Sequence, residues 1–260
     1  ASGHLGGSGF ESRVCFAGVC GRGRMIVAAF ESEEFRRYPF DGILGLGLPS
    51  QAVGEGFNLV AALAKQKGFT SESFALALRA DGNSTLNFAP DSHALVAAGL
   101  APEALAWLPV DSRHGEWAVQ LEGVSVGGER MTAACGPPSG CRAVLDSGTS
   151  VIALPLPLAR ALQRKLGDLG DCSREALDTL PRISFSFVGN HSYSVAPAQY
   201  VEVSEIDPSH CRLLIQPMDE DGTLTRTSIL GQPFLLERFV VYNQSALKVG
   251  VAPIPPATPA

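Results

Sequence analysis

The pentapeptide DSGTS at 146–150 has the residue types and spacing in this 260-residue chain that best suit catalysis. It follows the apolar run AVL and precedes the apolar run VIALP, which places Asp146 at a predicted strand-to-turn junction. Burying a carboxylate is costly unless hydrogen-bond donors surround it. Gly148 allows a tight turn that presents amide hydrogens, and the Thr149 hydroxyl can donate to the outer carboxylate oxygen. An aspartate held in this way stays ionised and fixed in direction, as a general base acting on water must be.

The same pentapeptide also has an interpretation without catalysis. Asp, Ser and Gly are ordinary turn residues, and an Asx turn between two strands would use all three. Taken alone, the pentapeptide does not decide between a catalytic aspartate and a turn. The choice depends on the residues around it.

Other catalytic and metal-binding chemistries lack their motifs in this chain. There is no G-x-S-x-G elbow for a serine hydrolase and no C-x-x-C pair for zinc. The acidic stretch 219–222 resembles part of a calcium loop but lacks the remaining ligands. The histidines match no metal-binding spacing and are interpreted as surface or loop residues: His4, His93, His114, His191 and His210. We therefore expect no metal and no cofactor.

Composition predicts a β-rich protein with one large core or two smaller ones. The chain is 45% hydrophobic and 18% charged, and its short apolar runs are broken by 28 Gly and 18 Pro. A net charge of −6 argues against a nucleic-acid partner, because no basic stripe could neutralise phosphates. No apolar run is long enough to span a bilayer.

The six cysteines predict three disulfides. Cys15 with Cys20 and Cys135 with Cys141 are spaced to close small loops, and Cys172 with Cys211 would close a long one. Disulfides imply the secretory pathway, with an extracellular or a vacuolar or lysosomal destination. The alternative is a set of free buried thiols in a cytosolic protein. The N-x-S/T sequons at Asn83, Asn190 and Asn243 agree with a secreted context.

Several local elements can be predicted from periodicity and end signals. Helices are expected at 58–67, capped by Asn58 and stopped by Gly68, and at 156–166, ending at Gly167. A hairpin with an Asp81-Gly82 turn is expected at 73–90, and the alternating RISFSFVG predicts a half-buried strand. A glycine-tipped hairpin is expected to begin at 2–9 and to run into strands over 10–30, and a short buried strand is expected within 39–50. The proline-rich end, 253–260, is predicted to be disordered.

One internal repeat supports the interpretation of DSGTS. The triplet Ile43-Leu44-Gly45 recurs as Ile229-Leu230-Gly231, and each copy precedes a proline-containing turn or short helix. Such a triplet is common and means little alone. It gains weight from the blocks that surround it.

The chain resembles the pepsin-like aspartic protease family over nearly its whole length. Five blocks match that family in order: FDGILGLG, WLPV with Trp117 downstream, AVLDSGTS, LPRISF and ILGQPFLLERFVVYNQSALKVGVAP. The resemblance implies an all-β bilobal fold with few short helices and an incomplete first lobe. Its expected parts are the rest of the N-terminal lobe at 1–105, a C-terminal lobe at 106–252 and the tail at 253–260.

The resemblance also implies roles for individual residues. Asp146 matches the second-lobe catalytic aspartate, Thr149 its hydrogen-bond partner, Ser147 a link between the two active-site loops, and Ser150 a lining of the substrate cleft. Ser2, Gly3 and His4 would lie at the tip of the flap that closes over substrate. The two triplets, Ile43-Leu44-Gly45 and Ile229-Leu230-Gly231, would support the active-site loops. The implied activity is hydrolysis of peptide or protein substrates by a monomeric endopeptidase.

One departure from the family pattern limits this expectation. The family's first Asp-Thr/Ser-Gly motif and its flap tyrosine are absent, so we expect that the true N-terminus is missing and that this fragment alone is inactive. Candidate substitutes at Asp41, Asp81, Asp111 and Asp221 fail the pattern. One alternative is a non-catalytic pepsin-like protein that only binds peptides. Another is a homodimer pairing two copies of Asp146, which is disfavoured because retroviral-type chains are single small lobes.

Overall fold

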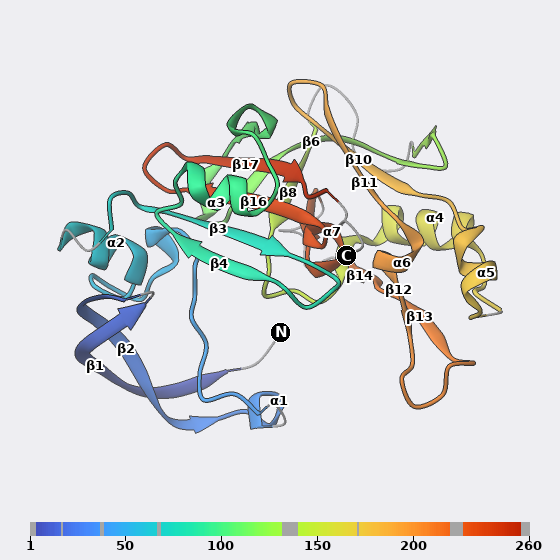
Figure 1. Cartoon of the computed structure of the whole chain (residues 1–260). Helices are drawn as coiled ribbons and strands as arrows, with labels where there is room; N and C mark the ends of the chain where they lie inside the picture. Colours follow the sequence, from blue (N-terminus) through green and yellow to red (C-terminus); the bar gives the residue numbers. More distant parts are fainter. Residues whose placement is uncertain are drawn as a thin grey trace. The chain divides into compact units, whose positions relative to one another are not determined.

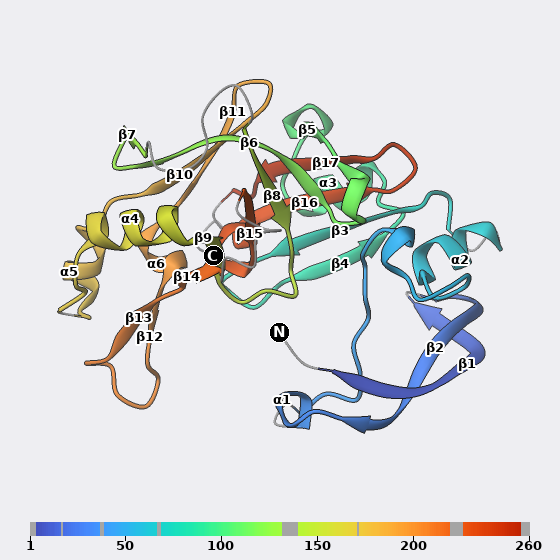
Figure 2. The same cartoon turned by 180° about the vertical axis from the view of Figure 1, so that it is seen from behind.

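The structure is a computed structural model that describes residues 4–16, 18–36, 39–66, 69–131, 140–170, 172–218 and 226–255. It is built mostly from strands, which confirms the predicted all-β class (Figures 1 and 2). The chain divides into two compact units. Unit 1 contains Ala1–Leu105, Asp111–Trp117 and Arg238–Ala260, and unit 2 contains Ala106–Val110 and Ala118–Glu237. None of the helices in the described part of the chain is long and apolar enough to cross a membrane.

Unit 1 is built around a sheet with the strand order β4-β3-β16-β17. Phe74, Trp117 and Tyr242 form an aromatic cluster on this sheet, and the Trp117 indole donates to the Leu46 carbonyl at 2.7 Å. Its elements are β1 (Leu5–Phe16), β2 (Val19–Glu31), α1 (Glu33–Arg36), η1 (Pro49–Gln51), α2 (Leu59–Lys65), β3 (Ser73–Leu78), β4 (Thr85–Phe88), α3 (Ser92–Ala97), η2 (Pro102–Ala104), η3 (Ser112–His114), β16 (Arg238–Asn243) and β17 (Lys248–Pro253).

A second sheet of unit 1 is the long hairpin β1–β2, which packs against α2. A Cβ at Gly21 would lie 2.6 Å from Leu63 and one at Gly23 would lie 2.6 Å from Leu59, so two glycines on one strand face let the helix approach closely. The Gln66 side chain then bonds both the N–H and the carbonyl of Arg22, at 2.8 and 2.7 Å. This amide takes the place of a neighbouring strand on part of the open edge of β2.

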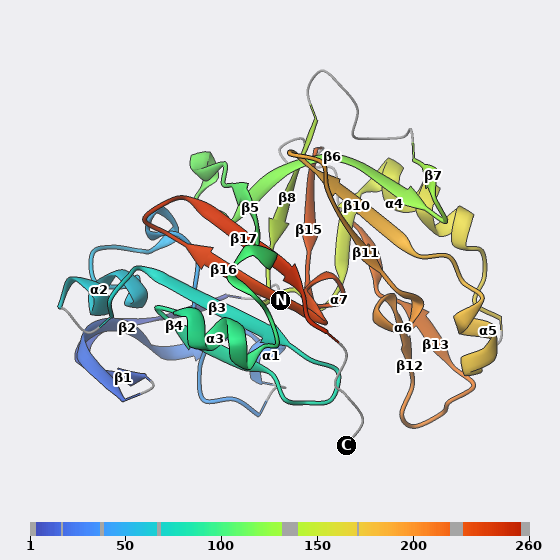
Figure 3. The ribbon, with the colours of Figure 1, turned by 45° about the horizontal axis from the view of Figure 1, so that its top comes forward.

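Unit 2 is built around a mixed sheet with the strand order β11-β10-β6-β8-β15-β9-β14, to which β7 adds along β6 (Figures 2 and 3). A separate two-stranded sheet joins β12 to β13. The elements are β5 (Ala106–Pro109), β6 (Ala118–Val126), β7 (Glu129–Arg130), β8 (Cys141–Leu145), β9 (Ile152–Pro155), α4 (Leu156–Leu166), α5 (Arg174–Asp178), β10 (Ile183–Phe187), β11 (His191–Val195), α6 (Pro197–Tyr200), β12 (Val201–Val203), β13 (Cys211–Leu213), β14 (Ile215–Met218), β15 (Thr227–Leu230) and α7 (Gln232–Leu235).

The predicted helices and hairpin form where their end signals place them. Asn58 caps α2 by accepting from the Ala61 N–H, while residues 67 and 68, where the stop was expected, lie outside the described part of the chain. Helix α4 covers 156–166 and ends at Gly167. The turn at Asp81 and Gly82 joins β3 to β4, and β10 alternates buried and half-buried residues as predicted.

One of the local predictions was wrong, and another is confirmed with its turn at a different position. The stretch 39–50 contains no strand, and Phe40, Ile43 and Leu44 are exposed, because no strand of the described residues covers them. The hairpin expected to begin at 2–9 and run into strands is present as β1 paired with β2, but residues 5–9 lie within β1 and not at its turn. The tight turn of this hairpin lies instead at Gly18, whose φ is 80°.

The predicted domain limits and the observed units differ at the C-terminal side. The strands β16 and β17 were expected in the C-terminal lobe, but β16 pairs with β3 along its whole length and both strands belong to unit 1. Of the predicted disordered tail, Pro253 ends β17 and Ile254 is buried, while 256–260 lie outside the described residues.

The buried side chain of Tyr200 makes the stability of unit 2 fall at alkaline pH. Its buried phenol donates to the Pro181 carbonyl at 2.7 Å, and burial raises the pKa of Tyr200 from 10.0 to about 12. The folded state therefore binds more protons than the unfolded chain between these two pH values. The free energy of unfolding falls as pH rises through this window, by up to about 2 kcal/mol.

We predict that Tyr200→Phe is about 1 kcal/mol less stable than the parent chain below pH 10, because it loses one hydrogen bond. As pH approaches 12, the gap should close or reverse, since the phenylalanine cannot ionise. Urea unfolding of both proteins at several pH values measures the gap. All other titrating groups are the same in both proteins, so their contributions cancel in the difference in free energy of unfolding. A difference that does not change with pH would contradict the prediction.

Candidate active site

The site around Asp146 is created by an unusual strand order. The strands β8 and β9 follow each other in the chain, yet β15 lies between them in the sheet. It runs parallel to β8 and antiparallel to β9, so that Leu230 faces Leu145 on one side and Ile152 on the other. The connecting segment 146–151 must therefore pass across the end of β15.

Gly231, the residue that follows β15, makes this crossing possible. A Cβ at position 231 would lie 2.1 Å from the Thr149 carbonyl oxygen and 2.3 Å from the Val151 carbonyl oxygen, distances at which atoms overlap. The backbone φ of Gly231 is −83°, so close approach and not dihedral freedom requires glycine here. Hydrogen bonds from Asp146 N–H to the Leu230 carbonyl and from Gln232 N–H to the Thr149 carbonyl hold the two segments together, at 3.2 and 2.8 Å.

Both carboxylate oxygens of Asp146 accept hydrogen bonds from its own loop. The Gly148 N–H donates to Oδ1 at 2.9 Å, and the Thr149 hydroxyl donates to Oδ2 at 2.6 Å. Asp146 and Thr149 are half-buried. The donors expected from the sequence are therefore present, and they fix the direction of the carboxylate.

These local bonds do not by themselves distinguish Asp146 from an ordinary turn. Asp81, Asp91, Asp111 and Asp207 each accept an N–H from the residue two positions further on, as Asp146 does. These four lie in exposed turns or at helix starts. Asp146 differs in its position, between two buried strands and tied to a third. Its setting in the sheet, not the turn geometry, marks it as a site.

The remaining predicted residues of the site differ in their burial and hydrogen bonding, and two of them lie outside the described residues. Ser147 is half-buried and its carbonyl accepts from the Gln232 side chain at 3.4 Å, while Ser150 is exposed beside it. Gln232 was not predicted as a site residue, although its place directly after the Ile229-Leu230-Gly231 triplet was a usable signal. Ser2 and Gly3 lie outside the described residues. His4 lies just before β1, with its backbone bonded to Ser32.

The two Ile-Leu-Gly triplets have opposite environments. In unit 2, Leu230 is fully buried and Gly231 supports the Asp146 loop. In unit 1, Ile43 is 64% exposed and Leu44 37% exposed, and a Cβ at Gly45 would meet nothing within 4 Å. Only the second triplet supports a loop in the described part of the chain.

Disulfides close both units. Cys15 bonds Cys20 across the tip of the β1–β2 hairpin, and Cys172 bonds Cys211, as the spacing predicted. Cys141 at the start of β8 is also disulfide-bonded, and its predicted partner Cys135 lies outside the described residues.

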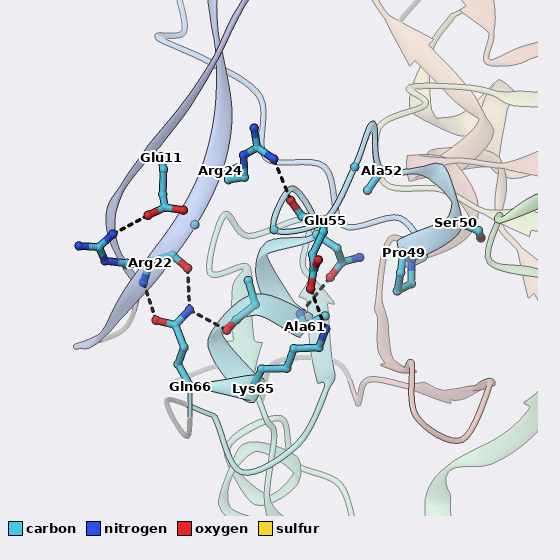
Figure 4. A pocket seen from close by; sticks show the side chains of 15 residues that line it. Glu11, Arg22, Arg24, Pro49, Ser50, Ala52, Glu55, Ala61, Lys65 and Gln66 are labelled. Atoms are coloured by element: carbon cyan, nitrogen blue, oxygen red, sulfur yellow. Dashed lines mark hydrogen bonds and ion pairs between the residues drawn. The ribbon is translucent and has the colours of Figure 1, made fainter.

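Unit 1 contains two cavities, and neither is lined by residues of the Asp146 loop. One, of about 880 Å³, lies between β2, α2 and the loop 49–56 and is lined by paired charges (Figure 4). In it Arg22 contacts Glu11 at 2.6 Å, and Lys65 lies 3.8 Å from Glu55. The other, of about 1160 Å³, is lined mainly by apolar residues of β2 and of 40–48. Among the described residues, no group of His, Cys, Asp or Glu is arranged to hold a metal ion.

Comparison with known proteins agrees with this fold and site. The sequence model of the eukaryotic aspartyl proteases matches residues 1–254. Cathepsin E of Rattus norvegicus is 29% identical over 240 residues, 86% of this chain and 56% of that protein. Cathepsin E-B of Xenopus laevis is 30% identical over 85% of this chain and 54% of that protein. Pepsin A of Sus scrofa is 29% identical over 83% of this chain and 54% of that protein.

The mostly-β fold, with an aspartate loop packed over the end of β15 at Leu230 and Gly231, places the chain in the aspartic protease class. The chain belongs to the eukaryotic aspartyl protease family. It spans about half the length of the relatives it matches.

The packing at Gly231 gives a prediction with a matched control inside the same chain. We expect Gly231→Ala to lower the free energy of unfolding by about 1–3 kcal/mol or more, because the loop carbonyls must move away. Gly45→Ala, in the corresponding triplet, should change it by no more than about 0.5 kcal/mol, because its Cβ meets open space. Chemical unfolding followed by circular dichroism compares the two. Equal stability of the two variants would contradict the steric role of Gly231.

Proposed function

We propose that this chain is part of an aspartic-type endopeptidase in which Asp146 is one of two catalytic carboxylates. The observation that carries the proposal is the Asp146 carboxylate, fixed by Gly148 and Thr149 at a strand junction of unit 2. Membership of the aspartyl protease family supports it. The substrate would be a peptide or protein, and the reaction the hydrolysis of a peptide bond by activated water.

The proposed mechanism needs a partner for Asp146. Two carboxylates close together share one proton, because both cannot ionise against each other's charge. The ionised member removes a proton from the water that attacks the peptide carbonyl. The protonated member donates a hydrogen bond to the carbonyl oxygen, where negative charge develops.

The second carboxylate of the proposed pair is not identified within these 260 residues. Asp-Thr/Ser-Gly occurs once in the sequence, at 146–148, and the described hydrogen bonds of Asp146 reach no other carboxylate. We propose that the partner aspartate belongs to polypeptide outside this sequence, on a loop supported by Ile43-Leu44-Gly45. The exposure of that triplet supports this assignment.

The other residues of the site would assist. Thr149 would hold the Asp146 carboxylate in direction, Ser147 would link the two active-site loops, and Ser150 would contact the substrate. Ser2, Gly3 and His4 would form part of the flap. The disulfides support a route through the secretory pathway, to an extracellular or a vacuolar or lysosomal location.

The first experiment compares the isolated chain with the full-length product of its gene. At acid pH, the 260 residues alone should show no turnover of a denatured protein substrate, and the full-length protein should cleave it. Sequencing the full transcript should reveal an in-frame Asp-Thr/Ser-Gly upstream. Turnover by the isolated chain would refute the need for a partner aspartate, and an upstream lobe without the motif would favour a non-catalytic peptide-binding protein.

The second experiment replaces the aspartate. In the full-length protein, Asp146→Asn should lower kcat by about 10²–10⁴-fold or more, because general acid–base catalysis is lost. Asp81→Asn is the matched control, since Asp81 accepts the same kind of N–H bond but lies in an exposed turn. Its kcat should equal that of the parent protein. If both variants kept full activity while folding normally, Asp146 would not be catalytic.

A third experiment tests the hydroxyl of Thr149. Thr149→Val keeps the shape of the side chain but removes the donor to Asp146 Oδ2, and should lower kcat by about tenfold, the value of one hydrogen bond. Thr149→Ser keeps the hydroxyl and should retain most of the activity. Steady-state kinetics with one peptide substrate measures both variants, and equal kcat values would exclude a role for this hydrogen bond.

A further inference from the structure

Three asparagines of the chain lie in N-x-S/T sequons, and the structure gives them different surroundings. Asn83 and Asn190 are exposed at hairpin turns, one in each unit, whereas Asn243 is half-buried at the end of β16. N-linked sugars are bulky and must project into solvent from the folded protein. The environment of each side chain therefore decides which sequon can carry one.

The Asn190 side chain is exposed at a hairpin turn. It lies in the turn between β10 and β11, where Phe187 pairs with His191, and β11 is an edge strand of its sheet (Figure 1). No hydrogen bond to the Asn190 side chain occurs among the residues that the structure describes. Ser192, which supplies the hydroxyl of the sequon, is also exposed.

The backbone at Asn190 has a left-handed φ of 63°, which asparagine tolerates better than most residues. This conformation explains an asparagine at 190 without any sugar. It does not explain the hydroxyl two residues later. The variants used as tests must therefore separate the turn from the sequon.

Asn83 lies in the turn between β3 and β4, with Asp81, Ser84 and Thr85 exposed around it. Its N–H donates to Asp81 Oδ1 at 2.9 Å, and this bond, with a side-chain bond from Asn83, keeps the pKa of Asp81 below its ordinary value. Both groups are exposed, so water can replace the side-chain bond at little cost. A sugar on Asn83 is compatible with the turn.

Asn243 is half-buried and bonded within its own turn. Its Oδ1 accepts the Ala246 N–H at 2.9 Å, closing the turn that joins β16 to β17. The middle residue of the sequon, Gln244, is buried and bonds Glu72 through both its backbone N–H and its side-chain amide, each at 3.0 Å. Asn243 is therefore partly covered and lies next to a buried residue, unlike the other two sequon asparagines.

We propose that Asn83 and Asn190 are N-glycosylation sites of the folded protein and that Asn243 carries no sugar. The proposal rests on passage through the secretory pathway and not on peptidase activity. In the reaction, Nδ2 of the asparagine bonds to C1 of the first sugar of an oligosaccharide carried on a lipid pyrophosphate. The C1–O bond breaks, the lipid pyrophosphate leaves with the electron pair, and the nitrogen loses one proton to a base of the transferase. No electrons are exchanged with an oxidant or a reductant.

The experiment secretes the chain from eukaryotic cells behind a cleavable signal peptide. The secreted protein is treated with a peptide N-glycosidase, which converts each glycosylated asparagine to aspartate, and its peptides are mapped by mass spectrometry. We expect conversion at Asn83 and Asn190 and none at Asn243. On a gel, the glycosidase should raise mobility by the equivalent of two sugar chains.

Paired variants separate the sequon from the turn. Asn190→Gly accepts the left-handed backbone and should remove one sugar chain, as should Ser192→Ala, whereas Ser192→Thr should keep it. At the other site, Asn83→Gln and Thr85→Val should each remove one chain, and Thr85→Ser should keep it. Asn243→Gln should leave the number of chains unchanged.

The result does not depend on efficient folding of every variant. The gel mobility of protein retained in the cell also shows whether Asn83 and Asn190 carry sugar chains. Absence of any glycosidase-sensitive shift in the parent chain, in both cell and medium, would overturn the proposal. A sugar on Asn243 in the secreted protein would overturn the structural selection. Either result would leave the assignment of Asp146 unaffected.

Discussion

The packing of the 146–151 segment over the end of β15 is the constraint on which the site of unit 2 depends. Two loop carbonyls lie where a Cβ of residue 231 would be, so the strand can end there only in glycine. The same contact places the Leu230 carbonyl under the Asp146 N–H and the Thr149 carbonyl over the Gln232 N–H. The loop is thereby fixed at both ends before any side chain takes part. On this fixed loop, the Gly148 N–H and the Thr149 hydroxyl then set the direction of the carboxylate.

This arrangement shows why local geometry alone could not identify the site. Several aspartates in exposed turns accept the same backbone N–H bond as Asp146. What differs is that the Asp146 loop joins two strands that a third strand separates. Strand order is a property of the whole sheet, and the pentapeptide DSGTS does not contain it. The surrounding family blocks made the assignment possible from sequence.

Elements with their own end signals were predictable, and elements that need a distant partner were not. Asn58 and Gly167 mark helix ends directly, and the Asp81-Gly82 turn marks a hairpin. The stretch 39–50 has the composition of a buried strand, but burial requires a neighbour that the described chain does not provide. The place of β16 and β17 in unit 1 also escaped prediction, because their pairing with β3 spans all of unit 2 in the sequence.

The long-range pairing of β3 with β16 has a consequence for biosynthesis. As the chain leaves the ribosome, β3 and β4 emerge early, whereas β16 appears only after every residue of unit 2 has been made. Until then Phe74 and Leu76 of β3 lack the strand that completes their sheet, and an open apolar edge invites wrong pairing. Unit 2 can close first, since its strands are continuous in the chain from β6 to β15. Unit 1 must finish last and would be the half that a chaperone needs to shield.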